Sequence, residues 1–342
     1  MRRIWGGIVV GFWVSIFLLP NTGFGQEFKL KLADPYPIGH VMHEVGKSLI
    51  ASIQQQTQNR VKVEHYPAEQ LGKAKDMLYL CSQGLSDISY VHITYFAGQL
   101  PLNNVAVLPF YTTALEGTEI YSRLVAENAE IRQEFQKYGT RVLSAFITNQ
   151  YDIGTIKKAV INPGDAKGLK LKTAGGMYDH IAKRYGIIPV NVAAAETYEA
   201  MQRGVVEGCI FSYPSLKGYR LNELLKYITS GLRMGGYPQV YVINEKPWQK
   251  LPPDIQTAIL KATQKNALFS PGDAWHREQM QLVEKFEKEG IAIHRIPPDQ
   301  RGIWEAPIQG IEEIWLQDME KKKLPGKKVF ADFLKISKEI GK

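Results

Sequence analysis

Residues 66–80 read YPAEQLGKAKDMLYL, and residues 81–101 continue the chain as CSQGLSDISYVHITYFAGQLP. Pro67 closes an expected strand, and Gly72 breaks the chain before an apolar helical face that begins at Met77. Gly84 then ends the expected helix, and a short strand follows at 87–91. A strand, a helix and a second strand in this order predict an α/β unit.

The same alternation recurs along the rest of the chain. Strands are expected at 30–32, 61–66, 141–147, 169–173, 189–192, 209–212, 239–244 and 291–296. Helices are expected at 41–53, 75–83, 115–138, 178–185, 197–203, 221–227, 252–289 and 298–315, with a break at Ser270-Pro271-Gly272. Strands that alternate with helices favour a mostly parallel sheet.

The N-terminus has the pattern of a secretory signal peptide. Arg2 and Arg3 form a basic start, residues 4–19 are apolar and uncharged, and Gly23-Phe24-Gly25 offers small residues for cleavage. A membrane-spanning helix needs about 20 apolar residues, so we favour cleavage after Gly25 over an uncleaved anchor. The mature chain is therefore expected in the periplasm.

Composition limits the partners and the redox chemistry. The 342 residues carry 42 Lys and Arg against 34 Asp and Glu, a formal net charge of +8 that includes the two signal arginines. The basic residues are scattered and form no nucleic-acid motif, so we expect no nucleic-acid partner. Cys81 and Cys209 are placed by the pattern in a helix of one domain and a strand end of the other, which predicts two buried free thiols.

Catalytic and metal-binding motifs are weak. The sequence has no nucleophile elbow, P-loop or dinucleotide fingerprint. His40 and His43 are three residues apart and could share a helix face as metal ligands, but no third ligand stands near them in the sequence. We therefore expect no catalytic residues, no metal and no cofactor, and interpret the two histidines as polar residues at a helix N-terminus.

Four stretches together resemble one family. The string YPAEQLGKAKDMLYLCSQGLSDIS, the motif VLPF at 107–110, GLKLKT at 168–173 and AETYEAMQRGVVEG at 195–208 resemble, in order and spacing, the solute-binding proteins of TRAP (tripartite ATP-independent periplasmic) transporters, of the C4-dicarboxylate-binding type. The resemblance covers nearly all of the mature chain.

The resemblance implies a two-lobed periplasmic binding protein of α/β class, with a ligand cleft between the lobes and a long helix that spans both. Lobe one would comprise residues 26–149 and 237–277, and lobe two residues 150–236 and 278–342. It implies a receptor, favoured as a monomer, that captures a small organic solute by closure of the lobes and delivers it to membrane permease subunits. Gly235 and Gly236 are candidate hinge residues, because glycine tolerates large changes of backbone dihedral angles.

Ligands of such folds bind outside the carboxyl ends of strands, which selects the candidate site residues. They are Tyr36, His92, Tyr95, Tyr151, Asp152, Lys172, Phe211 and Tyr213. Lys172 stands where many relatives carry a ligand-binding arginine, and Asp152 falls where a second arginine is frequent. A lysine cannot make the bidentate contact of an arginine with a carboxylate.

This residue set predicts a site for an organic acid or for a moderately apolar or aromatic compound, and tight binding of simple dicarboxylates is not expected. Two alternatives stay open at this point. Asp152 and the rings could hold a cationic amine, or Asp152 could pair with Lys172 and leave a neutral pocket. A different class of function, a secreted enzyme or ligand-sensing domain on the same scaffold, is the alternative to transport.

Overall fold

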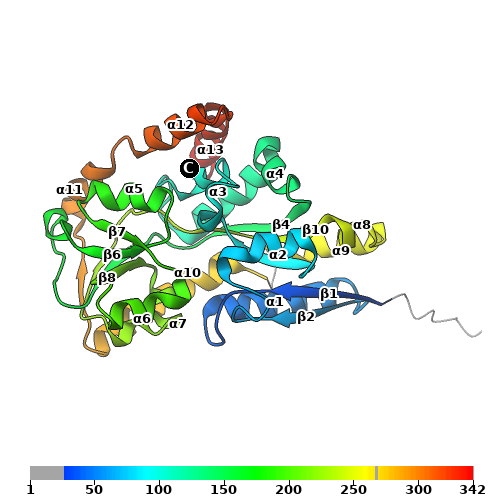
Figure 1. Ribbon diagram of the computed structural model, residues 1–342, viewed down its shortest axis with the longest axis horizontal. Helices are drawn as coiled ribbons and strands as arrows, with labels where there is room; N and C mark the ends of the chain where they lie inside the picture. Colours follow the sequence, from blue (N-terminus) through cyan, green and yellow to red (C-terminus); the bar gives the residue numbers. More distant parts are fainter. Residues whose placement is uncertain (1–26, 266–268, 342) are drawn as a thin grey trace, which may run out of the picture.

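The computed structural model describes residues 27–265 and 269–341 and contains two sheets (Figure 1). The proposed signal peptide, residues 1–25, lies outside the described residues. The first sheet has the order β2-β1-β3-β10-β4 and the second has the order β11-β9-β5-β8-β6-β7. The strands are β1 Phe28–Ala33, β2 Val61–Tyr66, β3 Ile88–His92, β4 Thr140–Ile147, β5 Asp152–Thr155, β6 Lys170–Thr173, β7 Ile188–Asn191, β8 Gly208–Phe211, β9 Tyr227–Ser230, β10 Pro238–Asn244 and β11 Ala292–Arg295. We call each sheet with its covering helices a lobe.

Most strand pairs are parallel, and the exceptions occur where the chain changes lobe. β10 runs antiparallel to β3 and β4, and β5 runs antiparallel to β8 and β9. The chain crosses between the sheets at 148–151, from β4 to β5, and again at 231–237, from β9 to β10. β10 begins beside the carboxyl end of β3, and β5 begins beside the carboxyl end of β8. Each of the two strands therefore runs antiparallel to its neighbours.

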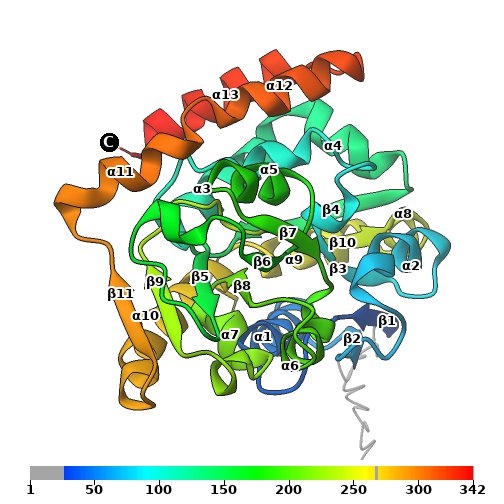
Figure 2. The ribbon, with the colours of Figure 1, turned by 60° about the vertical axis from the view of Figure 1, so that its left-hand side comes forward.

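Helices cover the two sheets (Figures 1 and 2). They are α1 Val41–Gln56, α2 Met77–Gln83, α3 Ala114–Glu127, α4 Ala129–Gln136, α5 Met177–Arg184, α6 Thr197–Gln202, α7 Tyr213–Gly218, α8 Glu245–Gln249, α9 Pro253–Ala262, α10 Pro271–Lys288, α11 Arg301–Glu305, α12 Ile311–Lys321 and α13 Gly326–Ile340. None of the helices in the described part of the chain has the length and apolar character that a membrane crossing requires.

The long helix α10 contacts both lobes. It packs against α1 and α3 of the first lobe and against α7 of the second. Trp275, near its start, is buried in the core beside β1, whereas Phe286, near its end, is buried in the core of the second lobe. This confirms the expected lobe-spanning helix. The expected break at Ser270-Pro271-Gly272 is the start of α10, where proline is tolerated because the first helical N–H needs no partner.

Two helix predictions between 115 and 227 are wrong. The single helix expected at 115–138 is divided at Asn128, which has an extended backbone and caps α4 by accepting a hydrogen bond from Ile131 N at 2.9 Å. The helix expected at 221–227 is a short 3₁₀ turn, Leu221–Glu223, followed by strand β9, which pairs with β5. Pairing with a sheet outweighs a weak local helical preference.

The C-terminal region also differs from the expectation. The helix expected at 298–315 is divided into α11 and α12, and Gly310 between them adopts a left-handed conformation, φ +69°. The lysine-rich end of the chain forms α13, which buries Val329, Phe333 and Ile336. Figure 2 shows α12 and α13 along one side of the molecule, where α12 contacts α5 and α13 contacts α3. The lobe boundaries given above remain a prediction.

Cys81 in α2 and Cys209 in β8 are both free and buried. The prediction of two buried thiols is therefore confirmed. Burial raises the pKa of Cys209 to about 12, so this thiol stays protonated and unreactive at neutral pH.

The two crossing segments are held together around Gly235. Gly235 N donates to Gln150 Oε1 at 2.7 Å, and Gly235 O accepts from Tyr151 N at 3.1 Å. The residue has φ +83°, and a Cβ atom at this position would lie 2.2 Å from Val107 O. Both the backbone conformation and the close approach of another main chain therefore require glycine.

We predict that Gly235→Ala lowers the free energy of unfolding by about 2–4 kcal/mol, because it adds a backbone clash to the cost of a positive φ. Equilibrium unfolding in denaturant measures this change. Gly204→Ala is the matched control for φ alone, since Gly204 has φ +71° and no atom within 4 Å of its Cβ position. Gly164→Ala, with neither feature, should be neutral. Equal losses for Gly235→Ala and Gly204→Ala would contradict the argument.

Candidate functional site

A group of rings from both lobes packs together, and we call it the aromatic centre. Its members come from strand ends, helix termini and a 3₁₀ turn of both lobes. They are Tyr36, His92, Tyr95, Tyr151, Tyr178, Phe211, Tyr219 and Tyr237, six of them buried and Tyr95 and Tyr219 half-buried. The structure therefore brings together five of the eight residues that the sequence selected, and Lys172 joins them as described below.

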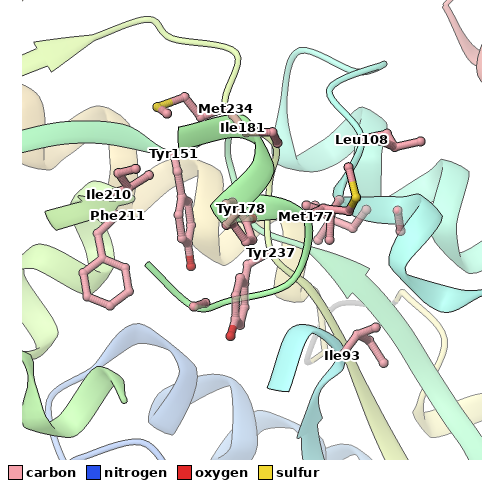
Figure 3. Packing of buried hydrophobic residues seen from close by; sticks show 14 of the residues in the cluster. Ile93, Leu108, Tyr151, Met177, Tyr178, Ile181, Ile210, Phe211, Met234 and Tyr237 are labelled. Carbon is pink, nitrogen blue, oxygen red and sulfur yellow. The ribbon is translucent and has the colours of Figure 1, made fainter. Parts of the chain in front are cut away.

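Tyr151 lies at the middle of this centre. Its ring is stacked on Tyr237 with centroids 5.7 Å apart and on Tyr178 with centroids 5.4 Å apart. Its edge meets Phe211 at 5.8 Å. Figure 3 shows the side chains of Tyr151 and Tyr237 extending in the same direction, with Phe211 beside them. Rings at these distances are in direct contact and form an apolar wall.

Lys172 is a buried cation within this wall. It lies in β6, pairs with Cys209 of β8 and has 1% of its surface exposed. Its Nζ lies 3.6 Å from the centroid of the Phe211 ring. Across residues 27–265 and 269–341, no hydrogen bond or ion pair reaches this ammonium group. Burial lowers the pKa of Lys172 to about 7, because the charged form loses its hydration without gaining a counter-charge.

His92 is a second buried polar group of the aromatic centre. Its ring lies 5.1 Å from Tyr237 and 5.4 Å from Tyr36. Burial lowers its pKa to about 3, and the nearby Lys172 acts in the same direction, so His92 is neutral at physiological pH. Within the described residues, His92 Nδ1 and Tyr178 Oη have no hydrogen-bond partner. Unpaired buried polar atoms are costly, and a solute that pairs with them would gain binding energy.

The lobes touch directly at the aromatic centre. Ala194 N of the second lobe donates to Tyr95 Oη of the first lobe at 3.1 Å. Tyr36 and Tyr219, also from different lobes, have ring centroids 6.4 Å apart. This is a closed arrangement, and a solute can reach Lys172 only when the lobes part or the rings shift.

Asp152 and Tyr213 have other partners. Asp152 Oδ1 accepts from Gly231 N at 2.9 Å and from Leu232 N at 3.3 Å, and burial raises the pKa of this carboxyl to about 7. Tyr213 is stacked on Phe286 of α10 at 5.6 Å. The described residues contain no ion pair between Asp152 and Lys172, so the proposed pairing is not formed. Asp152 begins β5 opposite Phe211, but its carboxylate is held by main-chain N–H groups of the loop that follows β9.

The sequence analysis missed three rings of the centre: Tyr178, Tyr219 and Tyr237. Tyr237 directly precedes β10, and a mostly parallel sheet would place the start of that strand away from the ligand. The antiparallel direction of β10, with Gln239 opposite His92, places Tyr237 at the carboxyl edge of β3 instead. The sequence signal that could have revealed Tyr237 is the double crossing of the chain between the lobes. A strand that follows such a crossing runs antiparallel to its neighbours.

Comparisons with known proteins match most of the chain. A family model described as bacterial extracellular solute-binding protein, family 7, matches residues 33–321. A solute-binding protein of Albidiferax ferrireducens is 24% identical over 282 residues, which are 80% of this chain and 82% of that protein.

Two solved structures share the fold. A TRAP solute-binding protein from Rhodoferax ferrireducens, in complex with copurified benzoate, has a TM-score of 0.85 at 20% identity and covers 92% of this chain and 98% of its own. A TRAP periplasmic solute-binding protein from Bordetella bronchiseptica, with bound (R)- and (S)-mandelate, has a TM-score of 0.81 at 23% identity and covers 91% and 99%. The expected two-lobed fold is confirmed.

We predict that the charge on Lys172 opposes closure of the empty protein. Opening hydrates the ammonium group and returns its pKa toward the ordinary value of 10.5, whereas closure holds it at about 7. The closed form therefore binds fewer protons between these values, and raising the pH through this window should favour closure. At or below a pH of about 7 the charge costs closure on the order of a few kcal/mol.

Small-angle scattering of ligand-free protein tests this prediction. Lys172→Met should have a smaller radius of gyration than the wild type at neutral pH, and the pH dependence should disappear. Lys170→Met is the matched control, because Lys170 is an exposed lysine of the same strand. Identical pH profiles for the wild type and Lys172→Met would show that this charge does not oppose closure.

Proposed function

The chain belongs to the bacterial extracellular solute-binding protein family 7, and we propose that its solute is an aromatic monocarboxylate held by Lys172. The chain is a solute-binding receptor of the TRAP transporter type, which captures small organic acids and works with membrane components. Its family and its structural neighbours are solute-binding proteins of transporters, not enzymes. The alternative of a secreted enzyme therefore has no support.

The observation that carries the proposal is the unpaired Lys172 ammonium against the Phe211 ring. A carboxylate would supply the missing counter-charge in a water-poor site, where a charge-assisted hydrogen bond is strong. The surrounding rings would bury the apolar body of the same solute. Benzoate and mandelate, the ligands of the two solved structures described above, are aromatic monocarboxylates, and this supports the same class here.

The charges of the site favour one carboxylate over two. Lys172 is the only cation in the described part of the aromatic centre, because His92 is neutral. Lys75 is exposed, with Nζ 5.9 Å from the Tyr95 ring centroid, and can attract anions from the rim. A second buried carboxylate would face neutral rings and would cost several kcal/mol. Simple dicarboxylates such as succinate should therefore bind poorly.

Solute charge would drive the closing movement. Closure of the empty protein buries the Lys172 ammonium without compensation, whereas closure around an anion buries a neutral pair. The anion thus binds the closed form better than the open form, which is the condition for a ligand to shift the equilibrium. We propose that the permease recognises this closed, loaded monomer in the periplasm, after removal of residues 1–25.

Calorimetry and thermal unfolding with matched ligands test the proposed solute class. Benzoate should bind and raise the melting temperature, whereas benzamide, which lacks the charge, and succinate, which lacks the ring, should not. Lys172→Met should weaken benzoate binding by about 10–100-fold, the loss expected for one hydrogen bond to a charged group. Lys170→Met should bind benzoate normally.

Cyclohexanecarboxylate tests the contribution of the aromatic character of the solute separately from that of its charge and apolar bulk. It keeps the carboxylate and the apolar bulk, so its weaker binding relative to benzoate measures what stacking on Tyr151 and Phe211 contributes. Tight binding of succinate, or equal benzoate binding by the wild type and Lys172→Met, would refute the proposal.

A further inference from the structure

Three side chains that the solute site does not use come together at the edge of the first lobe. Asp34 directly follows β1, His65 lies in β2, and His43 lies in the first turn of α1. Each offers one ligand atom, and these atoms all lie within 4.8 Å of one another. Parallel pairing of β1 with β2, in which Leu32 lies opposite His65, places the carboxylate beside the imidazole.

The contacts inside this cluster leave one imidazole nitrogen without a hydrogen-bond partner among the described residues. His65 Nε2 lies 3.2 Å from Asp34 Oδ2. The His43 ring is stacked on the His65 ring with centroids 5.1 Å apart and an interplanar angle of 13°. His43 is 8% exposed, and its buried Nδ1 has no hydrogen-bond partner in the part of the chain that the structure describes. An imidazole nitrogen without a hydrogen bond thus belongs to a group that also contains a carboxylate and a second imidazole.

Gly46, which has no side chain, faces Asp34 and His65 from α1. It lies on α1 three residues after His43, so both face the end of β1. A Cβ atom on Gly46 would lie 2.9 Å from Asp34 Oδ2 and 3.4 Å from His65 Nε2. Any larger residue would fill the space between α1 and the carboxylate. The helix therefore approaches the cluster closely, and no side chain at position 46 covers the ligand atoms from this side.

We propose that Asp34, His43 and His65 bind one divalent transition-metal ion, for which zinc is the best match. Two imidazoles and one carboxylate suit zinc and its transition-metal neighbours, whereas magnesium and calcium prefer oxygen ligands. Tetrahedral zinc bonds of about 2.0–2.2 Å place ligand atoms roughly 3.3–3.6 Å apart, so ion binding would draw the side chains together by up to about 1.5 Å. Three protein ligands leave a fourth position for water.

The ion would fix the segment that leads to the aromatic centre. Asp34 Oδ1 accepts a hydrogen bond from Tyr36 N at 2.7 Å, so the carboxylate that holds the ion also orients Tyr36. Tyr36 is stacked on His40 at 4.2 Å, which precedes α1. The metal would therefore link β1, β2 and α1 and stabilise the first lobe, while the solute binds elsewhere through Lys172.

Zinc titration of the metal-stripped full-length protein tests this proposal. Calorimetry, with a chromophoric chelator in competition, should show one zinc ion bound per chain and a raised melting temperature. His43→Gln and His65→Gln should each weaken binding by more than about 100-fold, since even partners outside the ligand set contribute about 10–100-fold. His276→Gln, a change in a half-exposed histidine of α10, is the matched control and should bind zinc normally.

Gly46→Ala provides a second test, because it keeps all three ligands and places a methyl group against Asp34 Oδ2 and the His65 ring. It should weaken zinc binding while benzoate binding is retained, which also shows that the variant is folded. If Gly46→Ala does not fold, His43→Gln still decides, since its Nδ1 has no hydrogen bond to lose. Equal zinc affinity of the wild type and His43→Gln, or tighter binding of calcium or magnesium than of zinc, would overturn the proposal.

Discussion

The buried, unpaired ammonium group of Lys172 is the constraint on which the rest of the site depends. A charge in a ring-lined space between two lobes is tolerable only if water or an anion reaches it. Open lobes supply water and a bound carboxylate supplies the anion, whereas a closed and empty protein supplies neither. The position of one amine above Phe211 thus connects charge selectivity with the movement of the lobes.

The rings around the amine are brought together by the path of the chain. Two crossings between the sheets introduce two antiparallel strands, β5 and β10. These strands begin beside the carboxyl ends of β8 and β3. Tyr151 before β5 and Tyr237 before β10 therefore stack on each other from neighbouring crossing segments. The stacked pair lies where the lobes are joined, so the wall of the site is also part of the connection between the lobes.

The sequence predicted those parts of the site that depend on local patterns. Lys172 and His92 follow motifs at the ends of parallel strands, and both lie in the aromatic centre as expected. Tyr237 could not be found in this way, because its place depends on the direction in which β10 enters a distant sheet. Asp152 follows β4 as expected, but the sequence did not show that it begins β5 or that its carboxylate bonds the loop after β9. Local periodicity predicts elements, whereas long-range pairing decides which strand end meets the ligand.

The segment after β1 limits where the molecule can bend. Asp34 N donates to Tyr66 O, its carboxylate contacts Tyr36 and His65, and Tyr36 is packed on His40. These contacts join the segment that carries Tyr36 to β2 and α1. Tyr111 Oη accepts from Gly236 N at 2.6 Å and ties the second crossing to the first lobe. We therefore expect the residues between Gly236 and β9, rather than the walls that hold the solute, to take up any closing movement of the lobes.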